Sequence, residues 1–188
     1  MERVICYIDG YNFFHATKDK PTARINFASL ATSFLDSPAR RLGEKQLVKV
    51  CYFSAIATWR TEDAAKHKSY INALKQTGVE VILSHFKKKQ RKCLNCNAKW
   101  QSHEEKESDV RIALHILEDV FDNKFDTAFI LSGDSDLVPV IEKVKSRHPD
   151  KRILVALPKH SLKYARDITR CAHGFVNLSP SRLKKHTL

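Results

Sequence analysis

The segment TAFILSGDSDLVPVIEKV, residues 127–144, decides the fold class of this chain. Its first five residues are apolar or β-branched, which predicts a buried strand over Thr127–Leu131. Ser132 and Gly133 then break the strand. The apolar residues that follow recur at the spacing of one helix face: Leu137, Val140, Ile141 and Val144. A buried strand that runs directly into a helix is typical of α/β proteins with a parallel sheet.

The rest of the chain repeats this alternation of strands and helices. Apolar runs predict further strands at Val4–Ile8, Leu47–Phe53, Val79–Leu83, Arg152–Leu157 and Phe175–Leu178. Helical spacing predicts helices at Asn26–Leu35, Thr61–Thr77 and Leu162–Ile168, and a capping-box pattern at Ser102 and Glu105 predicts one more that ends near Phe121. We therefore expect an open, mostly parallel sheet with helices on both of its faces.

One stretch, at about residues 86–102, interrupts this pattern. Residues 87–92 hold five basic side chains in six positions and lead into Cys93-Leu94-Asn95-Cys96. Because no periodicity persists here, we expect an insertion or extended loop. The remainder fits a single domain over residues 1–180, followed by a basic tail at 181–188 that we expect to be frayed.

The composition indicates a basic protein of a reducing compartment. Lys and Arg total 33 against 21 acidic residues, a formal net charge of +12, and such proteins commonly bind a polyanion such as nucleic acid. The alternative is that this positive charge serves only to keep the protein soluble. No run approaches the roughly 20 apolar residues of a membrane span. An odd number of cysteines, five, without a secretory signal favours a cytoplasmic location.

Four aspartates are placed where the predicted strands end or the predicted helices begin. Asp9 follows the first strand, Asp134 and Asp136 follow the strand at 127–131, and Asp109 lies early in the preceding helix. Ligands of open α/β sheets bind at the carboxyl edge of the strands. Four carboxylates gathered there repel one another unless cations share the site, and hard oxygen ligands suit Mg²⁺ or Mn²⁺. Such ions activate water for phosphodiester hydrolysis.

Each aspartate also has a simpler structural role open to it. Asp136 suits a cap for the helix that starts at Leu137. Asp9-Gly10 is a common turn pair. Asp109 on its own fits a solvated helix position. The joint placement of the four, rather than any one of them, favours a metal site.

Three motifs in this order resemble a known family. They are YIDGYN at 7–12, EKESDV at 105–110 and LSGDSDLVP at 131–139. Together they resemble the motifs of NYN domains, of the PIN-like nuclease superfamily, in the LabA-like bacterial branch. The resemblance extends from Val4 to about Leu178. It implies a Rossmann-like three-layer α/β/α fold with a mostly parallel sheet of five or six strands, a Mg²⁺ or Mn²⁺ site and ribonuclease activity.

The resemblance also assigns roles by position. The acidic cluster of the family corresponds to Asp9, Asp109, Asp134 and Asp136. Asn12 corresponds to the polar residue beside the first aspartate, and Ser132 to the small hydroxyl before the glycine. The chain departs from the family at Glu107-Ser108, where many relatives have Gly-Val. This departure concerns the backbone that presents Asp109 rather than the carboxylate itself.

The interrupting stretch carries two further candidate sites. Cys93 and Cys96 form half of a zinc site, and His85 and His103 flank the pair as candidates for the other two ligands. Free thiols or a redox pair are the alternatives. The basic residues, with a nearby tryptophan to stack a base, are candidates for RNA binding: Lys87, Lys88, Lys89, Arg91, Lys92 and Trp100.

These observations favour a metal-dependent endoribonuclease. A non-catalytic RNA-binding or regulatory NYN module and a DNA nuclease are the alternatives. RNA is the expected partner, no membrane is expected, and the sequence leaves a homodimer open.

Overall fold

The computed structural model describes residues 1–17, 24–35 and 44–188, and these form a seven-stranded sheet in the order β4-β3-β2-β1-β5-β6-β7. The strands are β1 Glu2–Asp9, β2 Lys45–Ala55, β3 Glu80–Lys92, β4 Lys99–Lys106, β5 Thr127–Leu131, β6 Arg152–Leu157 and β7 Phe175–Asn177. All neighbouring pairs are parallel except β3 and β4, which form an antiparallel hairpin. The sheet exceeds the expected five or six strands because β4 was not predicted.

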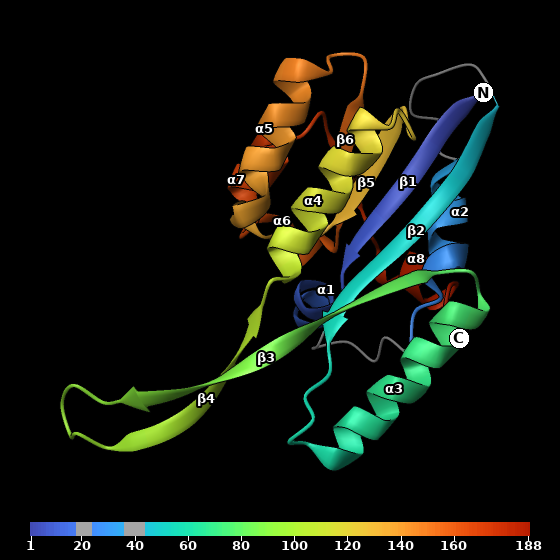
Figure 1. The fold of residues 1–188 in the computed structure, drawn as a ribbon. Coiled ribbons are helices and arrows are strands. Elements are labelled where there is room, and N and C mark those ends of the chain that lie inside the picture. Colours follow the sequence, from blue (N-terminus) through green and yellow to red (C-terminus); the bar gives the residue numbers. More distant parts are fainter. Residues whose placement is uncertain (18–23, 36–43) are drawn as a thin grey trace.

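Helices cover both faces of the sheet, which confirms the predicted three-layer fold (Figure 1). The helices on one face are α1 Gly10–Thr17, α2 Phe27–Leu35, α3 Thr61–Gln76 and α8 Pro180–Lys184. The other face is covered by α4 Ser108–Phe121, α5 Val138–Arg147 and α7 Arg166–Cys171. Two short turns of helix, η1 Ser135–Leu137 and α6 Lys159–Leu162, lie at the ends of strands β5 and β6. In the part of the chain that the structure describes, no helix is long and apolar enough to span a bilayer.

The central strand β1 has apolar side chains on both faces, so each face needs a helical layer to cover it. Val4, Cys6 and Ile8 pack under the α1–α2–α3 layer, whereas Ile5 and Tyr7 pack under α4 and α5, and none is more than 1% exposed. A strand covered on both faces is a continuous apolar run, as the sequence of β1 shows. Burial of each such side chain contributes about 1.5–3 kcal/mol.

The stretch expected as an extended loop is the outer part of the β3–β4 hairpin, which extends away from the body of the molecule (Figure 1). Ser102 and Glu105 lie in β4 opposite Lys89 and Phe86, so the predicted capping box is wrong and α4 begins only at Ser108. Cross-strand pairing over eight residue pairs outweighs a four-residue local pattern.

The C-terminal segment is packed rather than frayed, contrary to expectation. Leu183 of α8 is buried at 1% exposure, and the Arg182 guanidinium donates to the Ser33 carbonyl at 2.9 Å. Thr187 forms a bridge with Ile25. The helix begins at a Ser179 cap whose hydroxyl accepts from the Arg182 amide.

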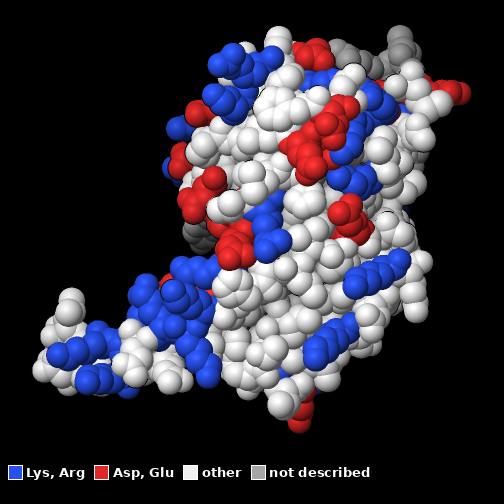
Figure 2. Space-filling view, in the orientation of Figure 1, with Lys and Arg blue, Asp and Glu red and all other residues white. Residues whose placement is uncertain are grey.

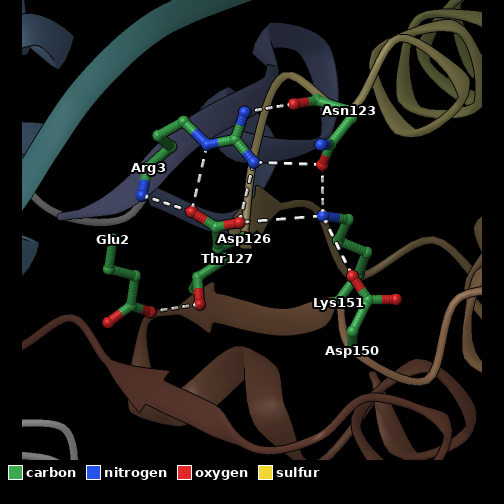
Figure 3. Close-up of polar contacts among 7 residues, drawn as sticks. All are labelled: Glu2, Arg3, Asn123, Asp126, Thr127, Asp150 and Lys151. Carbon is green, nitrogen blue, oxygen red and sulfur yellow. Dashed lines mark hydrogen bonds and ion pairs between the residues drawn. The ribbon is translucent and has the colours of Figure 1, made fainter.

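The amino ends of β1, β5 and β6 are joined by an ion-pair network (Figure 3). The Arg3 guanidinium and backbone amide both donate to Asp126 at 2.8 Å, and the Lys151 ammonium lies 3.6 Å from the same carboxylate. Lys151 also donates to Asn123 Oδ1 at 2.6 Å. The bonds from Arg3 hold the pKa of Asp126 well below its usual range. This network joins the amino ends of the central strands. The candidate site lies at the opposite edge of the sheet, where the carboxyl ends of these strands meet.

Candidate active site

Asp9 and Ser132 are brought together by the pairing of β1 with β5. Ile8 lies opposite Leu131, so both strands end at one level. The Ser132 hydroxyl donates to Asp9 Oδ2 at 2.9 Å, and the Asn12 amide donates to Oδ1 at 2.9 Å. Asp9 therefore caps α1 in addition to facing the edge of the sheet, so the expected Asp9-Gly10 turn is the start of a helix.

Asn12 joins the two strand ends from the other side. Its side-chain oxygen accepts from the Gly133 amide at 2.9 Å. A β-carbon on Gly133 would lie 3.1 Å from the Ala165 β-carbon, which explains why a glycine stands between Ser132 and Asp134. Asn12 and Ser132 thus orient the first carboxylate and the loop that carries the others.

Asp134 and Asp136 lie on this loop, at its more exposed end. Asp134 Oδ1 accepts from the Asp136 amide at 3.0 Å, and the Asp134 amide donates to the Ser132 hydroxyl at 3.1 Å. Asp134 therefore caps the short helix η1. The capping role that the sequence offered to Asp136 belongs to Asp134, and the Asp136 side chain is exposed.

Asp109 lies in the first turn of α4 and is half-buried. Burial raises the pKa of Asp109, and the neighbouring charges of Asp134 and Asp136 raise it further. The residue before the helix, Glu107, has φ +73°, the left-handed conformation that glycine adopts with least strain. The family resemblance described above implies a glycine at this position.

Asp9 shows the electrostatic character of the cluster. Burial, together with the charges of Asp109 and Asp134, raises the pKa of Asp9 to about 6, against the opposing effect of its bonds from Asn12 and Ser132. Carboxylates from two other segments therefore disfavour the ionised form of Asp9.

Glu105, on β4, is a fifth carboxylate that sequence reasoning did not place in the site. Its Oε1 accepts from the Ser108 hydroxyl, while Oε2 is buried without a hydrogen-bond partner among the described residues. Burial, together with the charges of Asp9 and Asp109, raises the pKa of Glu105 to about 7. Its position four residues before Asp109 was the available signal, but it was assigned to a helix cap.

This donor set fits a hydrated divalent cation. In the described ranges no three His, Cys, Asp or Glu side chains are close enough to hold one ion directly. Mg²⁺ usually keeps several waters and contacts only one or two carboxylates, so it does not require such a cage. A buried carboxylate oxygen without a partner and several mutually repelling acids are the features that a cation would neutralise.

Comparison with known proteins gives the family. The NYN domain model matches residues 3–179. The chain belongs to the NYN domain family. A curated relative, 6-hydroxy-3-succinoylpyridine 3-monooxygenase HspA of Pseudomonas putida, is 26% identical over 190 residues, which cover 83% of this chain and 59% of the relative. The chain thus spans less than two thirds of that protein.

A solved structure supports the same fold. A protein of unknown function from Vibrio parahaemolyticus RIMD 2210633 superposes with a TM-score of 0.63 at 20% identity. The match covers 95% of this chain and 94% of that one. At this identity the likeness concerns the α/β fold alone.

The four candidate zinc ligands of this NYN domain do not meet. His85 lies opposite Lys106 at the base of the hairpin, whereas Cys93 and Cys96 lie at its tip. The eight residues from His85 to Cys93 span about 26 Å of strand at roughly 3.3 Å each. His103 stacks on Trp59, and His85 lies 3.7 Å from Glu107. The predicted set of two cysteines and two histidines is therefore not formed.

The candidate RNA-binding residues of this NYN domain all lie on the hairpin. Lys and Arg side chains gather along it (Figure 2). Glu104 pairs with Lys89 at 3.3 Å and with Arg91, so part of this charge is balanced. Trp100, opposite Arg91, is half exposed. The hairpin starts beside the acidic cluster, because Glu105 belongs to both.

Proposed function

We propose that this NYN domain is a Mg²⁺- or Mn²⁺-dependent endoribonuclease. The observation that carries the proposal is the convergence of Asp9, Asp109 and Asp134 from β1, α4 and the loop after β5. The charges of Asp109 and Asp134 raise the pKa of Asp9, and the charge of Asp134 raises the pKa of Asp109. Such acids at the carboxyl edge of an α/β sheet suit a cation site for phosphodiester hydrolysis. The basic hairpin beside them suits the RNA backbone.

The residues of the chain divide the work. One or two of Asp9, Asp109 and Asp134 would contact the cation directly, and the others would bind its waters. When bound, the cation supplies a Lewis acid and lowers the pKa of water. Asn12 and Ser132 orient Asp9 and the loop through the bonds described above. Asp136, which is exposed at the mouth of the site, would accept a proton from an attacking water.

The experiment compares Asp134→Asn with the matched surface variant Asp63→Asn in Mn²⁺-dependent cleavage of single-stranded and structured RNA. Asparagine also caps helices, so Asp134→Asn should fold while losing at least about 100-fold in cleavage rate, as expected for loss of a charge that binds the cation. Asp63 lies in an exposed pair with Arg60 at 3.8 Å, and its replacement should leave the rate unchanged.

Other outcomes separate the alternatives. Wild-type protein that leaves both RNAs intact with either metal contradicts the proposal. RNA binding that persists in EDTA and in Asp134→Asn without any cleavage identifies a binding module. Faster cleavage of DNA than of RNA of the same sequence identifies a DNA nuclease.

The name of the Pseudomonas putida relative gives a second candidate, oxygenation of a hydroxylated pyridine. Consumption of oxygen with 6-hydroxy-3-succinoylpyridine in the presence of a two-electron reductant would demonstrate it. The net charge of +12 and the basic hairpin favour a polyanion over a small organic acid, so RNA hydrolysis is the first candidate.

A further inference from the structure

A pocket of about 360 Å³ lies between the loop after β2 and the base of the β3–β4 hairpin. Trp59 comes from the loop, and Ser84, Phe86, Lys88 and His103 come from the hairpin. The loop follows the carboxyl end of β2, and β2 pairs with β1, which ends at Asp9. The pocket is therefore at the same edge of the sheet as the acidic cluster.

Aromatic rings form most of the specific geometry of this pocket. The Trp59 and His103 rings stack with centroids 3.6 Å apart and an interplanar angle of 10°. Phe86 meets Trp59 edge-on at 4.9 Å and Tyr11 of α1 at 6.2 Å. Trp59 remains 39% exposed, so part of its ring is open to a ligand. A planar aromatic ligand suits such a surface.

Two polar atoms beneath the pocket surface lack partners. Ser84 Oγ and His103 Nε2 are buried and make no hydrogen bond to any residue that the structure describes. A buried polar atom without a partner costs about 1–3 kcal/mol. Because neither atom is exposed in the pocket, the surface open to a ligand is the ring of Trp59 and the side chain of Lys88.

The strand register connects the pocket to the acidic cluster. Phe86 pairs with Glu105 and Lys88 pairs with His103. Directly paired and alternate residues share one face of a β-ribbon, so Glu105 lies on the same face as Phe86, Lys88 and His103. Two residues along a strand span about 7 Å. A chain molecule on this face would pass from the carboxylates to the aromatic rings and then to Lys88.

We propose that this pocket binds the base of an RNA nucleotide next to the bond that is cleaved. The base would stack on the exposed part of Trp59, while Lys88 contacts a phosphate. The proposal rests on the proposed action on RNA, and it names the subsite that fixes the RNA relative to the carboxylates.

A binding cycle tests the pocket without cleavage. A labelled seven-nucleotide RNA and versions with one abasic position each are titrated in EDTA against wild type, Trp59→Ala and the control variant Phe121→Ala, which removes an exposed aromatic ring outside the hairpin and the pocket. Wild type should lose about 5- to 150-fold in affinity at the abasic position that removes the base on Trp59. Trp59→Ala should bind the intact RNA more weakly and lose nothing further at that position. Phe121→Ala should keep the positional loss.

The proposed base-binding role of the pocket is contradicted if wild type binds all abasic RNAs equally. It is also contradicted if Trp59→Ala loses as much affinity at the same abasic position as wild type does. Absence of any RNA binding overturns both this proposal and the action on RNA. If wild type shows the positional loss of affinity but does not cleave RNA in Mn²⁺, base binding in the pocket is supported and only the proposed nuclease activity is contradicted.

A second measurement does not depend on the folding of Trp59→Ala. The chain has two tryptophans, so Trp100→Phe leaves Trp59 as the sole reporter. Adenosine and uridine monophosphates should quench its fluorescence, whereas ribose 5-phosphate should not. Equal effects of all three compounds, or no effect of any, contradict a base-binding pocket.

Discussion

At the residue scale, the buried carboxylate of Asp9 lowers the stability of the folded protein when it is ionised. Its folded-state pKa of about 6 exceeds the ordinary value of 3.8, so between these pH values the folded protein keeps a proton that the unfolded chain releases. The free energy of unfolding therefore falls as pH rises through this window and stays low above it. Two pH units correspond to about 3 kcal/mol for this buried group.

We therefore expect Asp9→Asn to be more stable than wild type by up to about 3 kcal/mol at pH 7.5 in EDTA, and similar to it near pH 4. Asparagine can keep the bond from the Asn12 amide and can donate to Ser132. Urea unfolding at both pH values measures the difference. A variant less stable than wild type at pH 7.5 would show that the Asp9 charge is already compensated in the apo-protein.

Glu107 shows a second strain, in the backbone. Its left-handed conformation at φ +73° costs a residue with a β-carbon about 1–2 kcal/mol. Its carboxylate partners Arg111 at 3.1 Å and His85 at 3.7 Å are exposed, and such pairs contribute little.

Glu107→Gly should therefore be about 1 kcal/mol more stable than Glu107→Ala, because both variants lose the ion pairs and only glycine relieves the strain. Thermal unfolding of the two variants gives the difference directly. Equal stability would show that α4 can begin without the left-handed residue.

At the element scale, the β3–β4 hairpin separates what the sequence predicts from what it does not. Residues 4–8 and 127–131 were predicted because buried parallel strands are continuous apolar runs. The outer hairpin is solvated on both faces and rich in Lys, so its strands lack that pattern. Only pairing between Lys87 and Glu104, or Arg91 and Trp100, defines them.

The same reason explains the partial prediction of the site. Asp9 and Asp134 directly follow apolar strands, and their motifs place them. Glu105 reaches the cluster only because β4 pairs with β3 and returns its carboxylate to the edge of the sheet. No local pattern encodes that long-range arrangement. The prediction of His85 and His103 as zinc ligands is wrong for the opposite reason. These residues are near the cysteines in sequence, but an extended strand separates them in space.

Shortening the hairpin tests its role as an RNA-binding element. Replacement of residues 91–100 by an Asn-Gly turn between Gln90 and Gln101 removes Arg91, Lys92 and Lys99 and keeps the pocket residues. The slope of log affinity for single-stranded RNA against log salt should become shallower by about 2, from roughly 0.7 per phosphate contact. Unfolding stability should change little, because the removed residues are mostly exposed. An unchanged slope would place the RNA elsewhere.

At the scale of the whole molecule, the two edges of the sheet have opposite electrostatics. Arg3 and Lys151 compensate Asp126 at one edge, whereas acids accumulate without a paired cation among the described side chains around Asp9 at the other. The ion pairs at the Asp126 edge stabilise the fold. The acids around Asp9 destabilise it unless they stay protonated or a cation binds them. Metal addition should therefore act on one edge alone.

Mn²⁺ at about 100 times its dissociation constant should raise the free energy of unfolding by about 2.7 kcal/mol. For a chain of this length that corresponds to roughly 5–11 °C in Tm. Asp126→Asn should lower Tm with and without Mn²⁺ by the same amount, because its partners lie at the far edge and distant effects add. Asp134→Asn should abolish the Mn²⁺-induced rise while keeping the Tm measured in EDTA at or above that of wild type. A Tm rise that survives in Asp134→Asn but disappears in Asp126→Asn would place the metal at the wrong edge of the sheet, and the carboxylate cluster would then lose its proposed role.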